Sequence, residues 1–328
     1  MWRAALVVLL AALPAAGAPG RMQGVAIGMW GDRDQSMALS EIAALGADHV
    51  SLVVAWSQRD VRSVTLAPSP STVSDEHLRA TLRAARAAGL RVLLFPIVDL
   101  EIKGRGAWRG TLAPADVDAW WRSYETFILH YAAIAADEGA ELLAVGSELG
   151  STETWRDRWF HLIYSVKKRY RGKLVYSANW DHYRAVSFWE RVDYLGATAY
   201  NELTTKNDAS IAELEAGWRR VRDELVAFAA TVGRPLVLTE VGCPSRDGGA
   251  VHPWDYTLGT PIDLEEQRRA YAAFVAAWKD ELRLAGLFIW EWSGPGGPTD
   301  GGYTPRGKPA EKVLRDFYKR ETQAPPGP

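Results

Sequence analysis

Apolar and polar positions follow one another in blocks along this chain. Short apolar runs rich in Val, Leu and aromatic residues recur after residue 20. Runs of this length and composition are typical of strands that are buried on both faces. The predicted strands span residues 22–30, 49–56, 91–100, 141–148, 173–180, 192–200, 235–242 and 284–292. The pattern therefore predicts a sheet of eight strands.

Longer segments with the spacing of amphipathic helices separate most of these runs. Ser74 is a predicted N-cap for one of them, and Gly89 follows its end. The link DHYRAVSFWER, between the fifth and sixth strands, has room for only two or three helical turns. The expected helices cover residues 36–45, 75–88, 114–138, 153–170, 209–231, 264–282 and 309–320.

Eight strands and about eight helices in alternation predict a parallel sheet with right-handed crossovers. Eight is also the number of strands that closes a (β/α)8 barrel. An open, doubly wound sheet is the alternative, but no G-x-G-x-x-G motif follows the first strand. We therefore predict an α/β fold, a single (β/α)8 TIM barrel over residues 21–320.

The two ends of the chain have a different composition. MWRAALVVLLAALPAAGAPG combines one Arg, a short apolar run and small residues at Ala16–Ala18. This pattern predicts a signal peptide at residues 1–18 and a secreted or periplasmic protein; a retained N-terminal anchor is the alternative. No later run is apolar enough to span a membrane. The tail ETQAPPGP, residues 321–328, is predicted to be disordered.

Composition excludes several classes of function. A formal net charge of −2 gives no basic surface for nucleic acid. Cys243 is the only cysteine, which excludes an intramolecular disulfide and a cysteine-based metal site. The six histidines show no metal-binding spacing, so we expect neither a metal nor another cofactor. We expect a monomer. The 15 tryptophans supply flat apolar faces of the kind that stack on sugar rings.

Two glutamates stand at the ends of predicted strands, Glu148 on the fourth and Glu240 on the seventh. Strict alternation places Glu148 in a row with Leu142, Ala144 and Gly146, and Glu240 in a row with Leu236 and Leu238. Both acids are therefore expected to face the barrel mouth. Two carboxyl groups that converge there suit glycoside hydrolysis, in which one protonates the leaving oxygen and the other attacks or activates water. Taken singly, each acid fits a structural role equally well, either as the cap of the following helix or as the partner of an Arg at the barrel top.

Four segments carry a family resemblance: VGSELGS (145–151), PLVLTEVGCPS (235–245), GLFIWEWSG (286–294) and GYTPRGKPAEKVL (302–314). With them the chain resembles the clan A retaining glycoside hydrolases, and most of all glycoside hydrolase family 113, known for endo-β-1,4-mannanase activity. The resemblance implies that Glu148 is the acid/base and Glu240 the nucleophile. Many clan A enzymes have Asn before the acid/base, where this chain has Ser147. The contact to the sugar 2-hydroxyl, and with it the identity of the sugar, is therefore left open.

Six more residues are expected to bind substrate because they end strands or lie in a polar loop. Tyr200 is predicted to donate a hydrogen bond to Glu240 and so keep that carboxylate ionised. Trp290 resembles the platform under the reacting sugar in this clan. The full set is Trp30, Asn179, Trp180, Tyr200, Trp254 and Trp290.

Three other residues are given less weight. Glu291 alternates out of the Trp290 row and is expected to face a helix. Asp99 is expected either in the cleft or in a loop salt bridge, and Cys243 in a structural role.

The sequence thus predicts a retaining hydrolase of β-linked polysaccharide, and mannan is the first choice of substrate. The alternatives are a hydrolase of another β-glycan and a non-catalytic carbohydrate-binding barrel. The expected partner is a polysaccharide or oligosaccharide.

Overall fold

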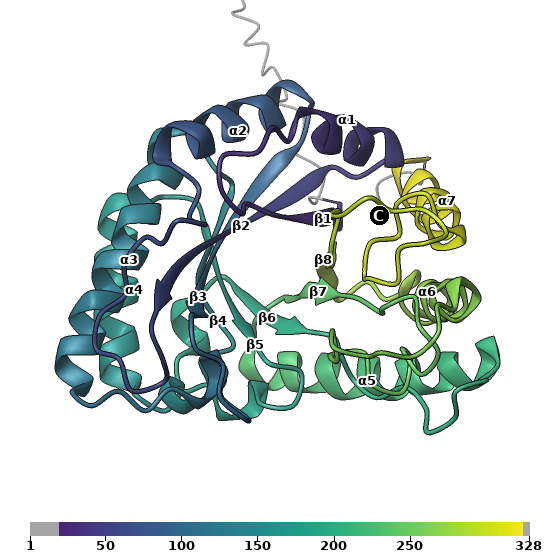
Figure 1. Ribbon diagram of the computed structural model, residues 1–328. Helices are drawn as coiled ribbons and strands as arrows, with labels where there is room; N and C mark the ends of the chain where they lie inside the picture. The colour runs from purple at the N-terminus through teal and green to yellow at the C-terminus, as the bar shows by residue number, and fades with distance from the viewer. Residues whose placement is uncertain (1–19, 324–328) are drawn as a thin grey trace, which may run out of the picture.

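The computed structural model describes residues 20–323, and its sheet is a closed barrel. Each strand pairs in parallel with the next one along the chain, and the first pairs with the last (Figure 1). This confirms the predicted single (β/α)8 barrel. The strands are β1 (Met22–Gly28), β2 (His49–Gln58), β3 (Arg91–Leu100), β4 (Leu142–Ser147), β5 (Lys173–Ala178), β6 (Tyr194–Thr198), β7 (Leu236–Val241) and β8 (Leu284–Ile289).

The helices form a ring outside the barrel (Figure 1). Ser74 caps α2 as predicted, since its hydroxyl accepts a hydrogen bond from the amide of His77. In α5, Ser210 and Glu213 form a reciprocal capping box. The helices are α1 (Ser36–Leu45), α2 (Asp75–Ala87), α3 (Val117–Asp137), α4 (Arg156–Arg169), α5 (Ile211–Val232), α6 (Leu264–Trp278) and α7 (Pro309–Gln323).

The connection between β5 and β6 differs from the other crossovers. It contains two short 3-10 helices, η3 (Tyr183–Ala185) and η4 (Trp189–Arg191), in place of an α-helix. The connection has 15 residues, 179–193, which leaves little room for a full helix together with the turns that lead into and out of it. The expectation of about eight helices is therefore corrected to seven α-helices within residues 20–323. Two further 3-10 turns, η1 (Arg109–Thr111) and η2 (Gly150–Thr152), lie in the loops after β3 and β4.

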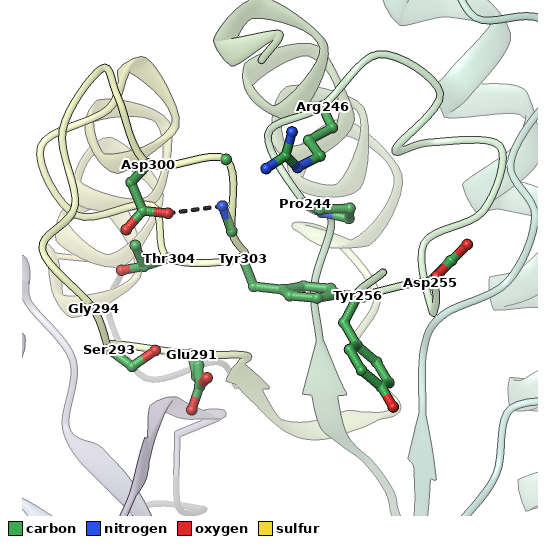
Figure 2. A pocket seen from close by; sticks show the side chains of 12 residues that line it. Pro244, Arg246, Asp255, Tyr256, Glu291, Ser293, Gly294, Asp300, Tyr303 and Thr304 are labelled. Carbon is green, nitrogen blue, oxygen red and sulfur yellow. Dashed lines mark hydrogen bonds between the residues drawn. The ribbon is translucent and has the colours of Figure 1, made fainter. Parts of the chain in front are cut away.

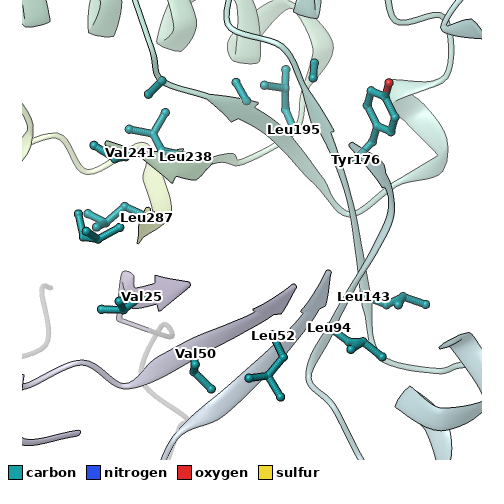
Figure 3. Packing of buried hydrophobic residues seen from close by; sticks show 14 of the residues in the cluster. Val25, Val50, Leu52, Leu94, Leu143, Tyr176, Leu195, Leu238, Val241 and Leu287 are labelled. Carbon is teal, nitrogen blue, oxygen red and sulfur yellow. The ribbon is translucent and has the colours of Figure 1, made fainter. Parts of the chain in front are cut away.

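Apolar side chains form two layers on opposite sides of the sheet. The inner layer fills the barrel with residues such as Met22, Phe95 and Phe288. The outer layer lies between the sheet and the helices, where Leu143, Leu238 and other side chains point away from the barrel axis (Figure 3). Burial of the strands on both faces explains why they read as continuous apolar runs.

Two predictions concern the ends of the chain. Helix α7 ends at Gln323, three residues into the segment 321–328 that was predicted to be disordered. The predicted signal peptide, residues 1–18, lies outside the described residues, as do residues 324–328. Among the described helices, none combines the length and the apolar character that a bilayer crossing requires.

Candidate active site

A cleft of about 760 Å³ opens at the carboxyl ends of the strands. It contains all eight residues that the sequence singled out for the site. Several more come from the β3 loop and from the long loops after β7 and β8. The lining residues are Trp30, Val98, Asp99, Leu100, Lys103, Ala107, Trp108, Arg109, Glu148, Asn179, Trp180, Asp181, Tyr200, Glu240, Trp254, Tyr256, Trp290, Glu291 and Tyr303.

Glu240 reaches the cleft through an irregularity in β7. Ala197 and Thr198 of β6 pair with Leu238 and Glu240, so one residue of β7 is left over at Thr239. Leu236 and Leu238 belong to the outer apolar layer, and Val237 belongs to the inner one. The row predicted from strict alternation was therefore wrong. The bulge reverses the alternation after Leu238 and turns Glu240 into the barrel mouth.

Glu148 is turned toward the cleft in a similar way. Leu142 and Ala144 do face the barrel interior, as predicted. The pairing of β4 with β5 then shifts between Ala144 and Ser147. Gly146 faces the outer layer, because a methyl group added there would lie 2.7 Å from the Tyr124 hydroxyl. The predicted row was therefore wrong at Gly146, whereas Glu148 lines the cleft as predicted.

The backbone of Glu148 itself is strained. Its φ is 55°, the only positive value at a residue other than glycine within residues 20–323. Left-handed backbone costs about 1–2 kcal/mol for an L-residue with a side chain. Strain of this kind persists where the surrounding structure imposes it, and it gathers at functional sites.

Each glutamate has a charged or polar partner. The Tyr200 hydroxyl donates a hydrogen bond of 2.8 Å to Oε2 of Glu240, as predicted. Nη1 of Arg109 lies 3.4 Å from Oε2 of Glu148. Arg109 is itself held by a 3.1 Å hydrogen bond from its Nε to the carbonyl of Val98, at the end of β3. The partners of the two acids thus come from β6 and from the β3 loop.

Burial raises the pKa of both carboxyl groups. For Glu240 the charge of Glu148 adds to burial, and the pKa rises to about 8 although the Tyr200 hydrogen bond lowers it. For Glu148, Arg109 opposes the effect of burial. Like charges in one buried site resist ionising together, so the two carboxyl groups titrate as a coupled pair. The hydrogen bond from Tyr200 acts on the Glu240 pKa in the predicted direction, but burial and the charge of Glu148 raise that pKa by more.

Indole rings flank the two acids. Trp180, after β5, stacks on Trp254 of the β7 loop with ring centroids 5.4 Å apart and an interplanar angle of 24°. Trp254 is 37% exposed although its ring is large and apolar. Trp108, in the β3 loop, is 38% exposed. Exposed, flat, apolar faces beside hydrogen-bonding groups suit the two sides of a sugar ring.

The residues just after β8 correct one prediction. Glu291 was expected to face a helix, but it lines the cleft. Trp292 is the residue that turns outward, and its Nε1 donates a 2.8 Å hydrogen bond to Glu41 of α1. The chain has left the sheet after Ile289, so alternation along the strand no longer decides the direction of these side chains.

Sequence reasoning missed Trp108 and Arg109 in the β3 loop. A signal was present, because every loop after a barrel strand borders the same face and this one carries an indole beside a guanidinium. Asp99 was expected in the cleft or in a salt bridge and is in both, with its Oδ1 3.3 Å from Nζ of Lys103. Cys243 is buried, and burial raises the pKa of its thiol. The thiol is therefore not a nucleophile at neutral pH.

A buried carboxylate joins the loops after β4 and β5. The Glu153 side chain is fully buried, and it accepts a 2.7 Å hydrogen bond from the Tyr176 hydroxyl. It also contacts Nδ1 of His182. The Tyr176 oxygen in turn accepts from the amide of Leu149, 3.0 Å away. This network fixes the backbone just after Glu148 and on both sides of the Asn179–Asp181 segment. Within residues 20–323 no group of three or more His, Cys, Asp or Glu side chains is arranged to hold a metal ion.

A closed barrel whose mouth gathers two coupled carboxyl groups and several indoles is the arrangement of a carbohydrate-active (β/α)8 protein. The chain belongs to Glycoside Hydrolase Family 113, whose family model matches residues 23–300. It is therefore a glycoside hydrolase.

Solved structures of this family are similar over nearly the whole chain. The GH113 β-mannanase AaManA of Alicyclobacillus acidocaldarius, solved with ManMIm, is 30% identical with a TM-score of 0.83, over 94% of this chain and 100% of that one. A second GH113 β-1,4-mannanase is 25% identical with a TM-score of 0.81, over 92% and 99%. A β-glucuronidase of Faecalibacterium prausnitzii shares the fold at 14% identity, with a TM-score of 0.64 over 94% of this chain and 50% of that chain. A search among curated proteins found no match.

Proposed function

We propose that this protein is a retaining endo-β-1,4-mannanase that uses Glu240 as nucleophile and Glu148 as acid/base. The observation that supports these roles best is the pair itself, two buried carboxyl groups that face one cleft and perturb one another's ionisation. The similar structures described as β-mannanases support the choice of substrate.

In the first step, a carboxylate oxygen of Glu240 attacks the anomeric carbon as the glycosidic bond breaks. Tyr200 holds Oε2 of Glu240, which leaves Oε1 free for the attack. Glu148 gives its proton to the departing oxygen, so the leaving sugar departs as a neutral alcohol. These roles require Glu148 to be protonated and Glu240 to be ionised when the sugar is bound.

In the second step, Glu148 accepts a proton from water while the water oxygen attacks the anomeric carbon. The bond to Glu240 breaks, and Glu148 is protonated again for the next cycle. Arg109 has one consequence for each step. Its charge lowers the pKa of Glu148, which makes that group a stronger acid in the first step, and its contact with Oε2 holds the carboxylate in place for the second. Two inversions at the anomeric carbon give net retention.

Digestion of linear β-1,4-mannan by the wild-type protein and two variants tests the proposal. We expect release of oligosaccharides by the wild type and none by Glu240→Ala. Glu148→Gln is expected to cleave a mannoside with a good leaving group far better than one with a sugar leaving group, because only the second needs protonation. The matched control Glu190→Gln changes an exposed acid in η4. Activity on a different β-glycan alone would refute the choice of mannan, and glycan binding without cleavage would refute the hydrolase roles.

Stereochemistry tests the mechanism separately. A retaining enzyme releases the β-anomer first, which NMR detects before mutarotation. A crystal structure is expected to show the two carboxyl groups about 5–5.5 Å apart, since a water molecule between them in an inverting enzyme requires about 6.5–9.5 Å. The wider spacing together with the α-anomer would refute the double displacement.

We also propose that the protein is exported, because residues 1–18 have the pattern of a cleaved signal peptide. N-terminal sequencing of the protein recovered outside the cytoplasm is expected to begin after Ala18. A mature chain that still begins at Met1 would contradict cleavage and favour a retained anchor.

A further inference from the structure

A smaller pocket of about 260 Å³ lies beside the cleft, between the loops that follow β7 and β8 (Figure 2). Glu291, Tyr256 and Tyr303 line both spaces, so the pocket adjoins the cleft at these three residues. Arg246 and Asp300 lie on the far side of the pocket from Glu291 (Figure 2). The volume is below the range of ~300–1,000 Å³ typical of pockets for drug-sized ligands. It suits a single small ring.

The walls of the pocket are fixed by a buried ammonium group. Lys308 has no exposed side-chain surface, and its Nζ donates to the Ser245 hydroxyl at 2.8 Å and to the Gly302 carbonyl at 2.9 Å. The same nitrogen lies 3.3 Å from Oδ1 of Asp300. Ser245 belongs to the β7 loop, and Asp300 and Gly302 belong to the β8 loop. Lys308 therefore ties the two walls together and holds the pocket open without a ligand.

The chemistry of the lining favours a neutral polyhydroxyl ligand over an ion. Asp300 accepts hydrogen bonds from the amides of Gly296 and Gly302, and its charge is balanced by the ammonium of Lys308. The guanidinium of Arg246 disfavours a bound cation, and Asp255 and Glu291 disfavour a bound anion. Hydroxyl groups both donate and accept hydrogen bonds, and can therefore pair with the guanidinium as well as with the carboxyl groups.

Two residues offer specific contacts to such a ligand. Oε2 of Glu291 is buried and has no hydrogen-bond partner among residues 20–323, so an acceptor is left unfilled where the pocket meets the cleft. Tyr256 is 74% exposed and presents an aromatic ring to the same space. A carboxylate beside an aromatic face is a common way to hold a sugar.

The polysaccharide backbone does not need this pocket. The cleft already extends to Trp30 and the β3 loop, and to Trp180 and Trp254 of the β5 and β7 loops. The pocket is an extension off that path, and Arg246, Gly301 and Asp300 line its far side. Resting on the proposed function, we propose that it binds a single sugar carried as a side branch on the polysaccharide in the cleft.

The test compares a linear β-1,4-mannan oligosaccharide with one of equal backbone length that carries a single galactosyl branch. Ser293→Phe places a ring in the pocket, and Ser293→Ala is the matched control; Ser293 lines the pocket and not the cleft. The measured quantity is kcat/KM for the branched substrate divided by that for the linear one. We expect Ser293→Phe to lower this ratio about tenfold, which is ~1.4 kcal/mol, and Ser293→Ala to leave it within about twofold.

An unchanged ratio in folded Ser293→Phe overturns the proposal. Equal losses on both substrates also overturn it, since the pocket then holds a backbone sugar. If Ser293→Phe does not fold, Tyr256→Ala is expected to lower the same ratio. An unchanged ratio in Tyr256→Ala overturns the proposal. Calorimetry on the Glu240→Gln protein separates this proposal from the proposed function. Tighter binding of the branched oligosaccharide, lost with Ser293→Phe, supports the pocket even if the wild type cleaves neither substrate, whereas equal binding of both oligosaccharides refutes it.

Discussion

Removing the Tyr200 hydroxyl tests whether this single hydrogen bond governs the ionisation of Glu240. The bond is 2.8 Å long and joins a buried phenol to a buried carboxyl group. It favours the ionised carboxylate, so Tyr200→Phe raises the pKa of Glu240 further above its ordinary value. A hydrogen bond to a charged group contributes about 1.5–3 kcal/mol, and 1.36 kcal/mol corresponds to one pKa unit. We therefore expect the acidic limb of the pH profile of kcat/KM to move up by about 1–2 units.

The assay is the pH dependence of kcat/KM on a chromogenic mannoside from about pH 4 to pH 10. At pH 6, below the displaced limb, Tyr200→Phe is expected to lose about tenfold or more in rate. The control is Tyr124→Phe, which removes another buried hydroxyl, one that donates 2.8 Å to the Val145 carbonyl outside the barrel. That control is expected to lower stability by about 1 kcal/mol and to leave the pH limbs in place. If the two variants give the same profile, the Tyr200 hydrogen bond does not tune Glu240 and the reasoning fails.

Three further predictions concern stability. Glu240→Gln is expected to stabilise the fold by about 4 kcal/mol more at pH 9 than at pH 5, because the unfolded wild type releases the Glu240 proton above pH 4.5 whereas the folded protein keeps it up to a pKa of about 8; chemical denaturation at both pH values measures it, and equal gains would contradict the raised pKa. Glu153→Ala is expected to cost about 2–4 kcal/mol in urea unfolding, since a buried tyrosine hydroxyl and His182 lose their partner, whereas Glu190→Ala, at an exposed ion pair, costs under about 1 kcal/mol. Gly146→Ala is expected to cost about 1–3 kcal/mol by overpacking, because its methyl group would lie 2.7 Å from the Tyr124 oxygen; a neutral effect in thermal melts would show that the outer layer has room there.

The residues of the cleft were largely predictable because a barrel imposes one simple rule. All loops after its strands meet at one face, so any chemistry-bearing residue at a strand end is a candidate for the same site. Trp30 and Trp290 lie far apart in sequence and still line one cleft, as this rule requires. Trp108 and Arg109 obey the rule too. They lie several residues after the end of β3, however, and the sequence pattern does not predict where a side chain within a long loop is placed relative to the cleft.

Residues near the strand ends were predicted less well. The predicted rows of alternating side chains failed at Gly146 and at Leu236–Leu238, and Glu291 was assigned to the wrong side. In each case the error lies within a few residues of a bulge or of the point where pairing stops. Alternation is a property of regular pairing, and one extra residue reverses it.

The sequence by itself determined the eight apolar strands, the helices between them and the identity of the two acids, because periodicity and residue type are local properties. Only the tertiary structure decided that the Glu148 and Glu240 side chains line the same cleft. Their directions depend on the bulges in β4 and β7 and on the left-handed backbone of Glu148. It also decided how the pKa values of the two carboxyl groups shift, because burial, Arg109 and Tyr200 act across segments that are distant in sequence. The pocket between the β7 and β8 loops depends on contacts that join them, among them the buried Lys308. Contacts between distant segments cannot be inferred from a local pattern.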